Sequence, residues 1–449
     1  MPNHMTSHAE VAGTAFRSGF SRSRYRRYSR FTFANMQTWS LYLLVMLWIA
    51  RNTILMRRRP GEMYTALDTM ALLQMALVVL ILIVLLSGPL FKLLPRIWNS
   101  STKFYFLYYF LAMISALWSP SAEFSLYRAV EVIALSMAVL VFCTAGANWD
   151  ENMRRGRILI WSVVAMLAIS TAYHGSILNL RNNTLGAASA MTACFFISWI
   201  LAAGRDQKDR KRMIQGMIGT ALVFLSLSLA SWWAFWFGIC YCALFSRRKW
   251  LIVMLFLIGT ILFFSLGTDT RENLLVRDKT PDQIETMRGR KLLWQDYWEL
   301  SEQRPILGFG FAVGAREIGS IYTTNAHNMF FGSLIGLGWI GVSCWILFFA
   351  ALGTELIRYR HSLRPAWLAC AAALAAGAMN SMSLSILGEQ WNVSTTVFVA
   401  FLGLHMCFVQ QERLALRVKR EKYFLARALK NARRTYRNPP AGLRGLPAD

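Results

Sequence analysis

Long apolar runs recur along most of the chain, and they leave few folds open to it. They lie near residues 37–56, 69–88, 102–119, 129–147, 157–174, 184–203, 213–231, 232–246, 250–267, 328–352, 365–387 and 393–410. A helix needs about 20 mostly apolar residues to cross a bilayer, and uninterrupted runs argue against a transmembrane β-barrel. Only 16% of the residues are charged, against about a quarter in soluble domains. The sequence therefore predicts an all-α, polytopic integral membrane protein with about 12 transmembrane helices.

Lysine and arginine collect between these runs and give the 449-residue chain a net charge of +25. Aromatic residues do not interleave with these cations as they do in nucleic-acid-binding proteins, so no nucleic-acid partner is expected. The cations are more frequent in the even-numbered loops than in the short odd-numbered ones, which predicts that both termini are cytoplasmic. The arginines at 57–59, together with Arg51, conflict with this topology because they would face outward.

The predicted topology divides the chain into consecutive segments. They are a basic cytosolic arm (1–35), transmembrane helices one to nine (36–267), a long periplasmic loop (268–327), transmembrane helices ten to twelve (328–410) and a basic cytosolic tail (411–449). The tail is either a surface helix that binds anionic lipid or a solvated segment that reinforces the topology. Runs seven and eight are separated either by a tight hairpin at Ser231-Trp232-Trp233 or by a break within one helix.

The 268–327 loop mixes acidic and basic residues, unlike the short loops. Its stretch GRKLLWQDYWEL has apolar residues at 292, 293, 297 and 300, a spacing typical of a helix. The following RPILGFGFAVG is typical of a glycine-rich turn. We expect a small, partly helical cap on the outer face.

The loop ends at His327, where a polar run meets an apolar helix. An imidazole in water has a pKa of about 6.5, so a histidine at the interface can serve as a neutral base. Asn328 could orient it. The glycines at 332, 336, 338 and 341 would allow the next helix to pack closely. The alternative is an interfacial histidine without a role.

Arg288 and Arg290 precede this histidine in MRGRKLLW. Planar guanidinium groups suit phosphate or diphosphate, although each arginine could equally balance the acidic residues of the loop. The chain has seven cysteines, all in or beside apolar runs and none in a CxxC, and no motif for a metal or a nucleotide. We therefore expect no metal and no cofactor.

Two stretches carry a resemblance to a known family. GRKLLWQDYWELSEQRPILGFGFAVG, followed by TTNAHNMFFGSLIGLGWIGV, resembles the ordered motifs of the O-antigen ligase and polymerase superfamily: a GR-x-x-x-W stretch, a P-x-x-G-x-G turn and an AHN entering a helix. ALWSPSAEFSLYRA (116–129) resembles its WS…R segment. The order of the motifs is more specific than any one of them.

The resemblance implies a membrane glycosyltransferase of the GT-C type in the bacterial inner membrane. Such enzymes take glycans from undecaprenyl diphosphate at the periplasmic face, and pass them to a growing glycan or to the lipid A core. His327 would then act on the acceptor hydroxyl, and Arg290, helped by Arg288, would hold the diphosphate without metal or nucleotide. Membrane lipids and other polysaccharide-assembly proteins are further expected partners.

The chain departs from the family pattern in one place. Many members carry an SR dipeptide near the outer end of a middle helix, also assigned to the diphosphate, whereas here LSLASWWAFW places Trp232 at the arginine position. Either Arg181, which we expect to face outward before a helix, is the substitute, or the diphosphate is held more weakly here, or the family arginine aligns with another position. His174, the other outward histidine, is expected to be interfacial without a role.

Polymerisation of exopolysaccharide or O-antigen repeat units by inversion is the preferred function. Transfer to lipid A core by an O-antigen ligase is the enzymatic alternative, because both acceptors need the same base. A non-enzymatic polysaccharide transporter is the other alternative, but few charges fall within the apolar runs and no repeat relates the halves. Arg128 and Glu131 should pair on one helix face, and the Asn380–Ser385 polar stripe favours interhelical hydrogen bonds over a cleft.

Overall fold

The computed structural model describes residues 33–54, 69–98, 100–174, 182–203, 209–226, 228–245, 290–313, 326–359, 365–384, 386–388 and 391–437, and single residues at 250, 254, 261 and 265. Regular structure within these residues is helical. The helices are α2 (Phe33–Thr53), α3 (Thr69–Leu86), α4 (Pro89–Trp98), α5 (Thr102–Ile114), the 3₁₀ turn η2 (Ser115–Leu117), α6 (Ala122–Thr144), α7 (Trp149–His174), α8 (Asn183–Ala203), α9 (Asp209–Leu225), α10 (Leu229–Phe245), α14 (Arg290–Ser301), α16 (Met329–Arg358), α17 (Pro365–Leu384) and α18 (Val393–Arg437). The fold is therefore all-α, as the apolar runs predicted.

Seven of the described helices are long and apolar enough to cross a membrane. They are α3, α6, α7, α8, α16, α17 and the first part of α18, while α5 with η2 and α10 are apolar but shorter. The chain is thus a polytopic membrane protein. The expected number of about 12 spans stays a prediction, since the ninth run (250–267) lies mostly outside the described residues.

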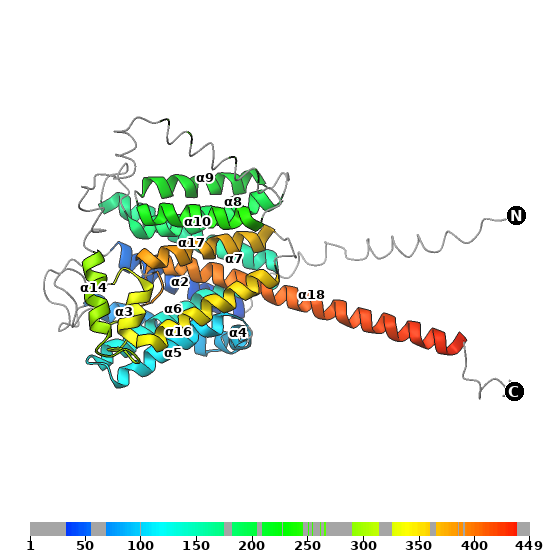
Figure 1. Cartoon of the computed structure of the whole chain (residues 1–449), viewed down its shortest axis with the longest axis horizontal. Helices are drawn as coiled ribbons and strands as arrows, with labels where there is room; N and C mark the ends of the chain where they lie inside the picture. Colours follow the sequence, from blue (N-terminus) through cyan, green and yellow to red (C-terminus); the bar gives the residue numbers. More distant parts are fainter. Residues whose placement is uncertain are drawn as a thin grey trace.

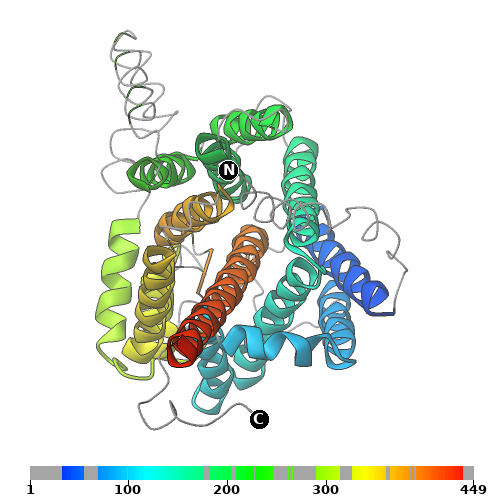
Figure 2. The same ribbon diagram turned by 90° about the vertical axis from the view of Figure 1, so that its right-hand side faces the viewer.

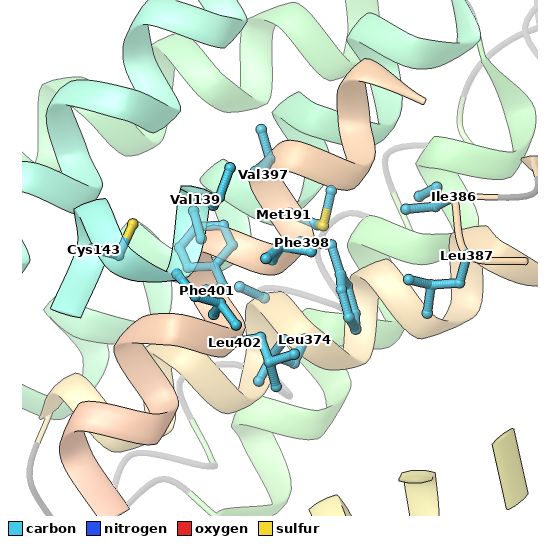
Figure 3. Close-up of a cluster of buried hydrophobic side chains, with 14 of the residues drawn as sticks. Val139, Cys143, Met191, Leu374, Ile386, Leu387, Val397, Phe398, Phe401 and Leu402 are labelled. Atoms are coloured by element: carbon cyan, nitrogen blue, oxygen red, sulfur yellow. The ribbon is translucent and has the colours of Figure 1, made fainter. Parts of the chain in front are cut away.

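The first half of α18 lies at the centre of the bundle, as Figure 2 shows in a view close to the helix axes. Figure 3 shows its side chains Val397, Phe398, Phe401 and Leu402 packed among residues of α6, α8 and α17. Burial is nearly complete over this stretch because every side of the helix faces another helix. A helix that is apolar all round belongs in such an interior.

Beyond the bundle, α18 continues as one helix whose second half projects away from the other helices (Figure 1). Side chains 414–429 are exposed, and arginine and lysine alternate there with Leu414, Val418, Leu425 and Leu429. The tail from 411 is therefore helical as far as Arg437. The two expected roles, lipid binding and topology, stay open.

Contacts between helices show which helix ends lie together at the same end of the bundle. Phe245 packs on Trp367, and Gly238 lies against Ala372 and Ala376, so α10 and α17 run antiparallel. The start of α10 therefore lies where α17 ends. Because Met382 near that end meets Asn328, as shown below, the starts of α10 and α16 share one end of the bundle, which we call the His327 end.

The structure tests several predictions about individual side chains. Arg128 and Glu131 form the expected ion pair at 2.8 Å, with Trp48 and Gln74 also donating to Glu131. The expected interhelical hydrogen bond of Asn380 is wrong, because its buried amide finds no partner among the described residues. Cys240 is exposed, whereas the other six cysteines are buried.

Runs seven and eight are two helices, but the expected hairpin position was wrong. α9 ends at Leu225 and α10 begins at Leu229, so Ser231-Trp232-Trp233 forms the first turn of α10. Two serines explain why α10 begins before the expected hairpin position. Ser228 accepts from the hydroxyl and the backbone amide of Ser231, a pattern typical of a helix start.

Candidate functional site

A break in α16 organises the region around His327. Gly338 has φ 63° and ψ −159° within the helix, far from helical values. A helix would join the amides of Trp339 and Ile340 to the carbonyls of Ile335 and Gly336. Instead these four groups bond to the segment 305–310: Trp339 and Ile340 donate to Pro305 and Ile306 (2.8 and 3.4 Å), and Phe309 and Gly310 donate to Ile335 and Gly336 (2.8 and 2.9 Å). The break thus exchanges two helical bonds for four across the interface.

Glycine is required at this joint for two reasons. Gly308 and Gly338 both have positive φ, which costs other residues about 1–2 kcal/mol. A Cβ on Gly308 would also meet the Ile335 carbonyl at 2.5 Å, and one on Gly338 would meet the Ile306 carbonyl at 2.3 Å. The P-x-x-G-x-G pattern is therefore the sequence that fits a broken helix.

The WS…R segment covers the other side of the same turn. The Trp118 indole donates to the Leu307 carbonyl (3.1 Å), and the Phe311 amide donates to Ser115 Oγ (2.9 Å). Ser125 Oγ donates to the Phe311 carbonyl (2.8 Å). Two motifs almost two hundred residues apart in the chain are therefore one structural unit.

His327 sits directly before α16 in a left-handed backbone conformation, with φ 50°. The side chain is partly exposed, whereas Ala326 and Asn328 on either side are buried. A non-glycine residue in this region is uncommon and is held there by its surroundings. The backbone thus fixes the direction in which the imidazole leaves the chain.

Asn328 holds the start of α16 in place. Its side-chain oxygen accepts from the amides of Phe330 (2.8 Å) and Phe331 (3.4 Å), the usual arrangement of a helix N-cap. Its Nδ2 donates to the Met382 carbonyl in the last turn of α17 (2.9 Å). Asn328 therefore ties the residue beside His327 to a second helix.

α14 supports His327 from the loop side. Trp294 donates from its indole nitrogen to the Ala326 carbonyl (3.0 Å) and stacks on Phe331 at a centroid distance of 5.6 Å. Leu293, Tyr297 and Leu300 of the same helix are buried against Phe309 and Ile335. The helix expected from the apolar spacing at 292–300 is therefore present, and it packs on the joint in α16.

The structure describes the backbone of only one of the three arginines predicted to bind diphosphate. Arg290 is the first residue of α14, and Arg288 and Arg181 lie outside the described residues. Arg290 precedes Trp294, which contacts Ala326, by four residues along α14. His174 ends α7 with its ring exposed against Tyr173.

Asn182, the first described residue before α8, lies beside the start of α10, where Trp232 stands at the position of the family arginine. The amide of Asn182, which follows Arg181, donates to the Ser226 carbonyl at 3.3 Å, immediately before α10. Trp232 lies in the first turn of α10 and packs on Phe224 and Trp236. Asn182 and Trp232 thus both lie at the His327 end of the bundle.

Sequence reasoning did not identify Trp294, Ser115 or Ser125 as supports of the site. Their signal was present, since Trp294 belongs to the GR-x-x-x-W stretch and the serines flank WSP, but the partner of each lies on a distant segment. Within the described residues, no three histidine, cysteine or carboxylate side chains converge in a way that could hold a metal ion.

Comparison with known proteins agrees with this arrangement. Residues 216–346 match the model of the family described as O-Antigen ligase, and this span includes α10, α14, the glycine-rich turn, His327 and the first part of α16. No curated protein matches the chain. The resemblance carried by the motifs is therefore confirmed over residues 216–346, where this membrane protein is similar to the O-antigen ligase family.

Proposed function

We propose that the protein is a glycosyltransferase that moves glycans from undecaprenyl diphosphate to an acceptor at the periplasmic face of the inner membrane. Its preferred role is to polymerise exopolysaccharide or O-antigen repeat units. The observation that carries the proposal is the strained backbone of His327 (φ 50°), held between Trp294 on one side and the N-cap Asn328 on the other. Strain of this kind is kept where a side chain must point in one direction.

The chemistry is a single displacement with inversion. His327 takes the proton of the acceptor hydroxyl, whose oxygen attacks the anomeric carbon of the donor sugar. The bond to the diphosphate oxygen breaks on the opposite side, and the diphosphate leaves with the electron pair. A diphosphate is a stable leaving group, so fixed cations can stabilise its charge without a metal.

The start of α16 supports assigning the diphosphate to arginine. Free amides at a helix N-terminus bind anions, but Asn328 already accepts from the amides of Phe330 and Phe331. The donor must therefore rely on side chains. Arg290, the first residue of α14, is one proposed ligand, and Arg288 and Arg181 are the others.

An O-antigen ligase that transfers the finished glycan to lipid A core is the second candidate, favoured by the description of the matching family. The test is deletion of the gene in its native host, followed by gel analysis of lipopolysaccharide and of lipid-linked glycan. Single repeat units on the lipid carrier support the polymerase. Long lipid-linked glycan with bare lipid A core supports the ligase, and an unchanged surface glycan contradicts both.

A further inference from the structure

A second candidate site lies at the opposite end of the bundle from His327. It is a cavity of about 390 Å³ between the start of α5, the last turns of α16 and the middle of α18. Ala351 on its wall lies 13 residues beyond the break at Gly338, roughly 20 Å along the second part of α16. The cavity is therefore separate from the proposed glycan site.

Three cations and one carboxylate line the cavity: Lys103, Arg358, Arg413 and Glu355. The carboxylate is already satisfied within the protein. The amide and hydroxyl of Ser101 donate to it (3.1 and 2.8 Å), His405 Nε2 lies 3.3 Å away, and Arg413 lies at 3.6 Å. Glu355 thus holds the start of α5, and although it lines the cavity its charge already has partners within the protein.

Lys103 and Arg358 are exposed, and neither has a carboxylate within 4 Å among the described residues. Lys103 occupies the first turn of α5, where the positive end of the helix disfavours a cation. An anion in the cavity would relieve this repulsion and neutralise Arg358. The charges therefore match a phosphate group.

The apolar part of the wall indicates where such a phosphate comes from. The ring of Trp98 is 75% exposed at the cavity, as is common for tryptophan at the level of lipid headgroups. Phe104 and Ala351 continue the wall. Leu107 follows Lys103 by four residues and Leu347 precedes Ala351 by four, so both exposed leucines lie on the helix faces that line the cavity and would contact the acyl chains of a lipid.

We propose that this cavity binds the phosphate of an anionic membrane lipid, in the leaflet opposite the glycan site. The proposal does not depend on the glycan chemistry. A lipid held here would join α5, α16 and α18, the last of which carries the basic tail. A free phosphate also carries negative charge, but it has no apolar part that would contact the exposed Trp98 and Leu347.

The test is native mass spectrometry of the full-length protein in detergent, titrated with phosphatidylglycerol. The variant is Lys103→Gln/Arg358→Gln. Each cation near an anionic lipid is worth about fivefold in affinity, so the pair should weaken the first bound lipid about 25-fold. The matched control is Arg210→Gln/Lys211→Gln, which removes the same charge from exposed positions at the start of α9 and should bind as the parent protein does.

Two further arms identify the ligand. Phosphatidylcholine, which has no net charge, should bind far more weakly than phosphatidylglycerol, and inorganic phosphate should compete only at high concentration. Equal loss in the control pair, equal binding of phosphatidylcholine, or saturation by phosphate alone would each overturn the lipid proposal. Thermal melting of every variant without added lipid identifies a loss that is due to misfolding, and Lys103→Arg/Arg358→Lys should then retain binding in a folded protein.

Discussion

The indole nitrogen of Trp294 donates a hydrogen bond to the carbonyl of Ala326, the residue directly before His327. The same ring stacks on Phe331, two residues into α16. One side chain of the loop helix therefore contacts the chain on both sides of the histidine. This makes Trp294 a positioning residue, because it acts on the proposed reaction through His327.

Trp294→Phe tests this role, since it keeps an aromatic ring over Phe331 and loses the donor. We expect the turnover rate to fall about fivefold to tenfold with little change in KM, because a hydrogen bond of about 1 kcal/mol is lost beside the base. The measurement is steady-state kinetics of glycan transfer. Trp298→Phe on the same helix, where the ring is 42% exposed, should change neither constant, and an equal effect there would argue against positioning.

Gly338→Ala tests the joint between α16 and the 305–310 segment. The new methyl group would meet the Ile306 carbonyl at 2.3 Å with φ at 63°, so we expect a loss of about 3 kcal/mol in the free energy of unfolding. Thermal denaturation in detergent measures it. Gly353→Ala in the same helix meets nothing within 4 Å and should be neutral or stabilising by about 0.5–1 kcal/mol. Equal melting temperatures would contradict the geometry of the joint.

Asn328→Asp separates the two functions of Asn328. An aspartate still caps α16 but cannot donate to the Met382 carbonyl, and its charge would face that oxygen. We expect the free energy of unfolding to fall by about 1–3 kcal/mol, because the Met382 carbonyl loses its donor, and the transfer rate to fall clearly. Asn328→Ala should lose the cap as well and melt lower. If Asn328→Asp is fully active, the contact with α17 has no part in orienting His327.

Arg290→Lys tests diphosphate binding. Lysine keeps the charge but loses the paired donors, so we expect KM for the lipid-linked donor to rise about tenfold. Lys291→Arg, the reverse exchange at the next position, is the control and should leave KM unchanged. A normal KM for the Arg290→Lys enzyme would show that Arg290 does not bind the diphosphate, and Arg288 and Arg181 would be the remaining proposed ligands.

The helices were predictable from the sequence because apolar runs of about 20 residues have few other uses. α4 was not predicted, because it does not contain a long apolar run. Its ten residues include Lys92, Pro95 and Arg96, and this amphipathic pattern does not stand out between two apolar runs. Its buried side, with Leu93 and Ile97, is visible only once its neighbours are in place.

The residues that form the site were largely predictable from the sequence, but the contacts between them were not. A histidine before a glycine-rich helix and a P-x-x-G-x-G turn were both evident. That the turn pairs with the carbonyls of Ile335 and Gly336 was not, because α16 gives no sign of its break except a run of glycines. Contacts between residues such as Ser125 and Phe311 depend on long-range packing, which local patterns do not carry.

The most direct test of the account is transfer by purified full-length protein, with lipid-linked repeat units as donor and no added metal or nucleotide. His327→Ala should lower the turnover rate about 10²- to 10⁴-fold, the usual contribution of a general base, while donor binding and melting temperature stay as in the parent protein. Longer glycans formed by the folded His327→Ala variant at the parent rate would contradict the central claim that this histidine activates the acceptor.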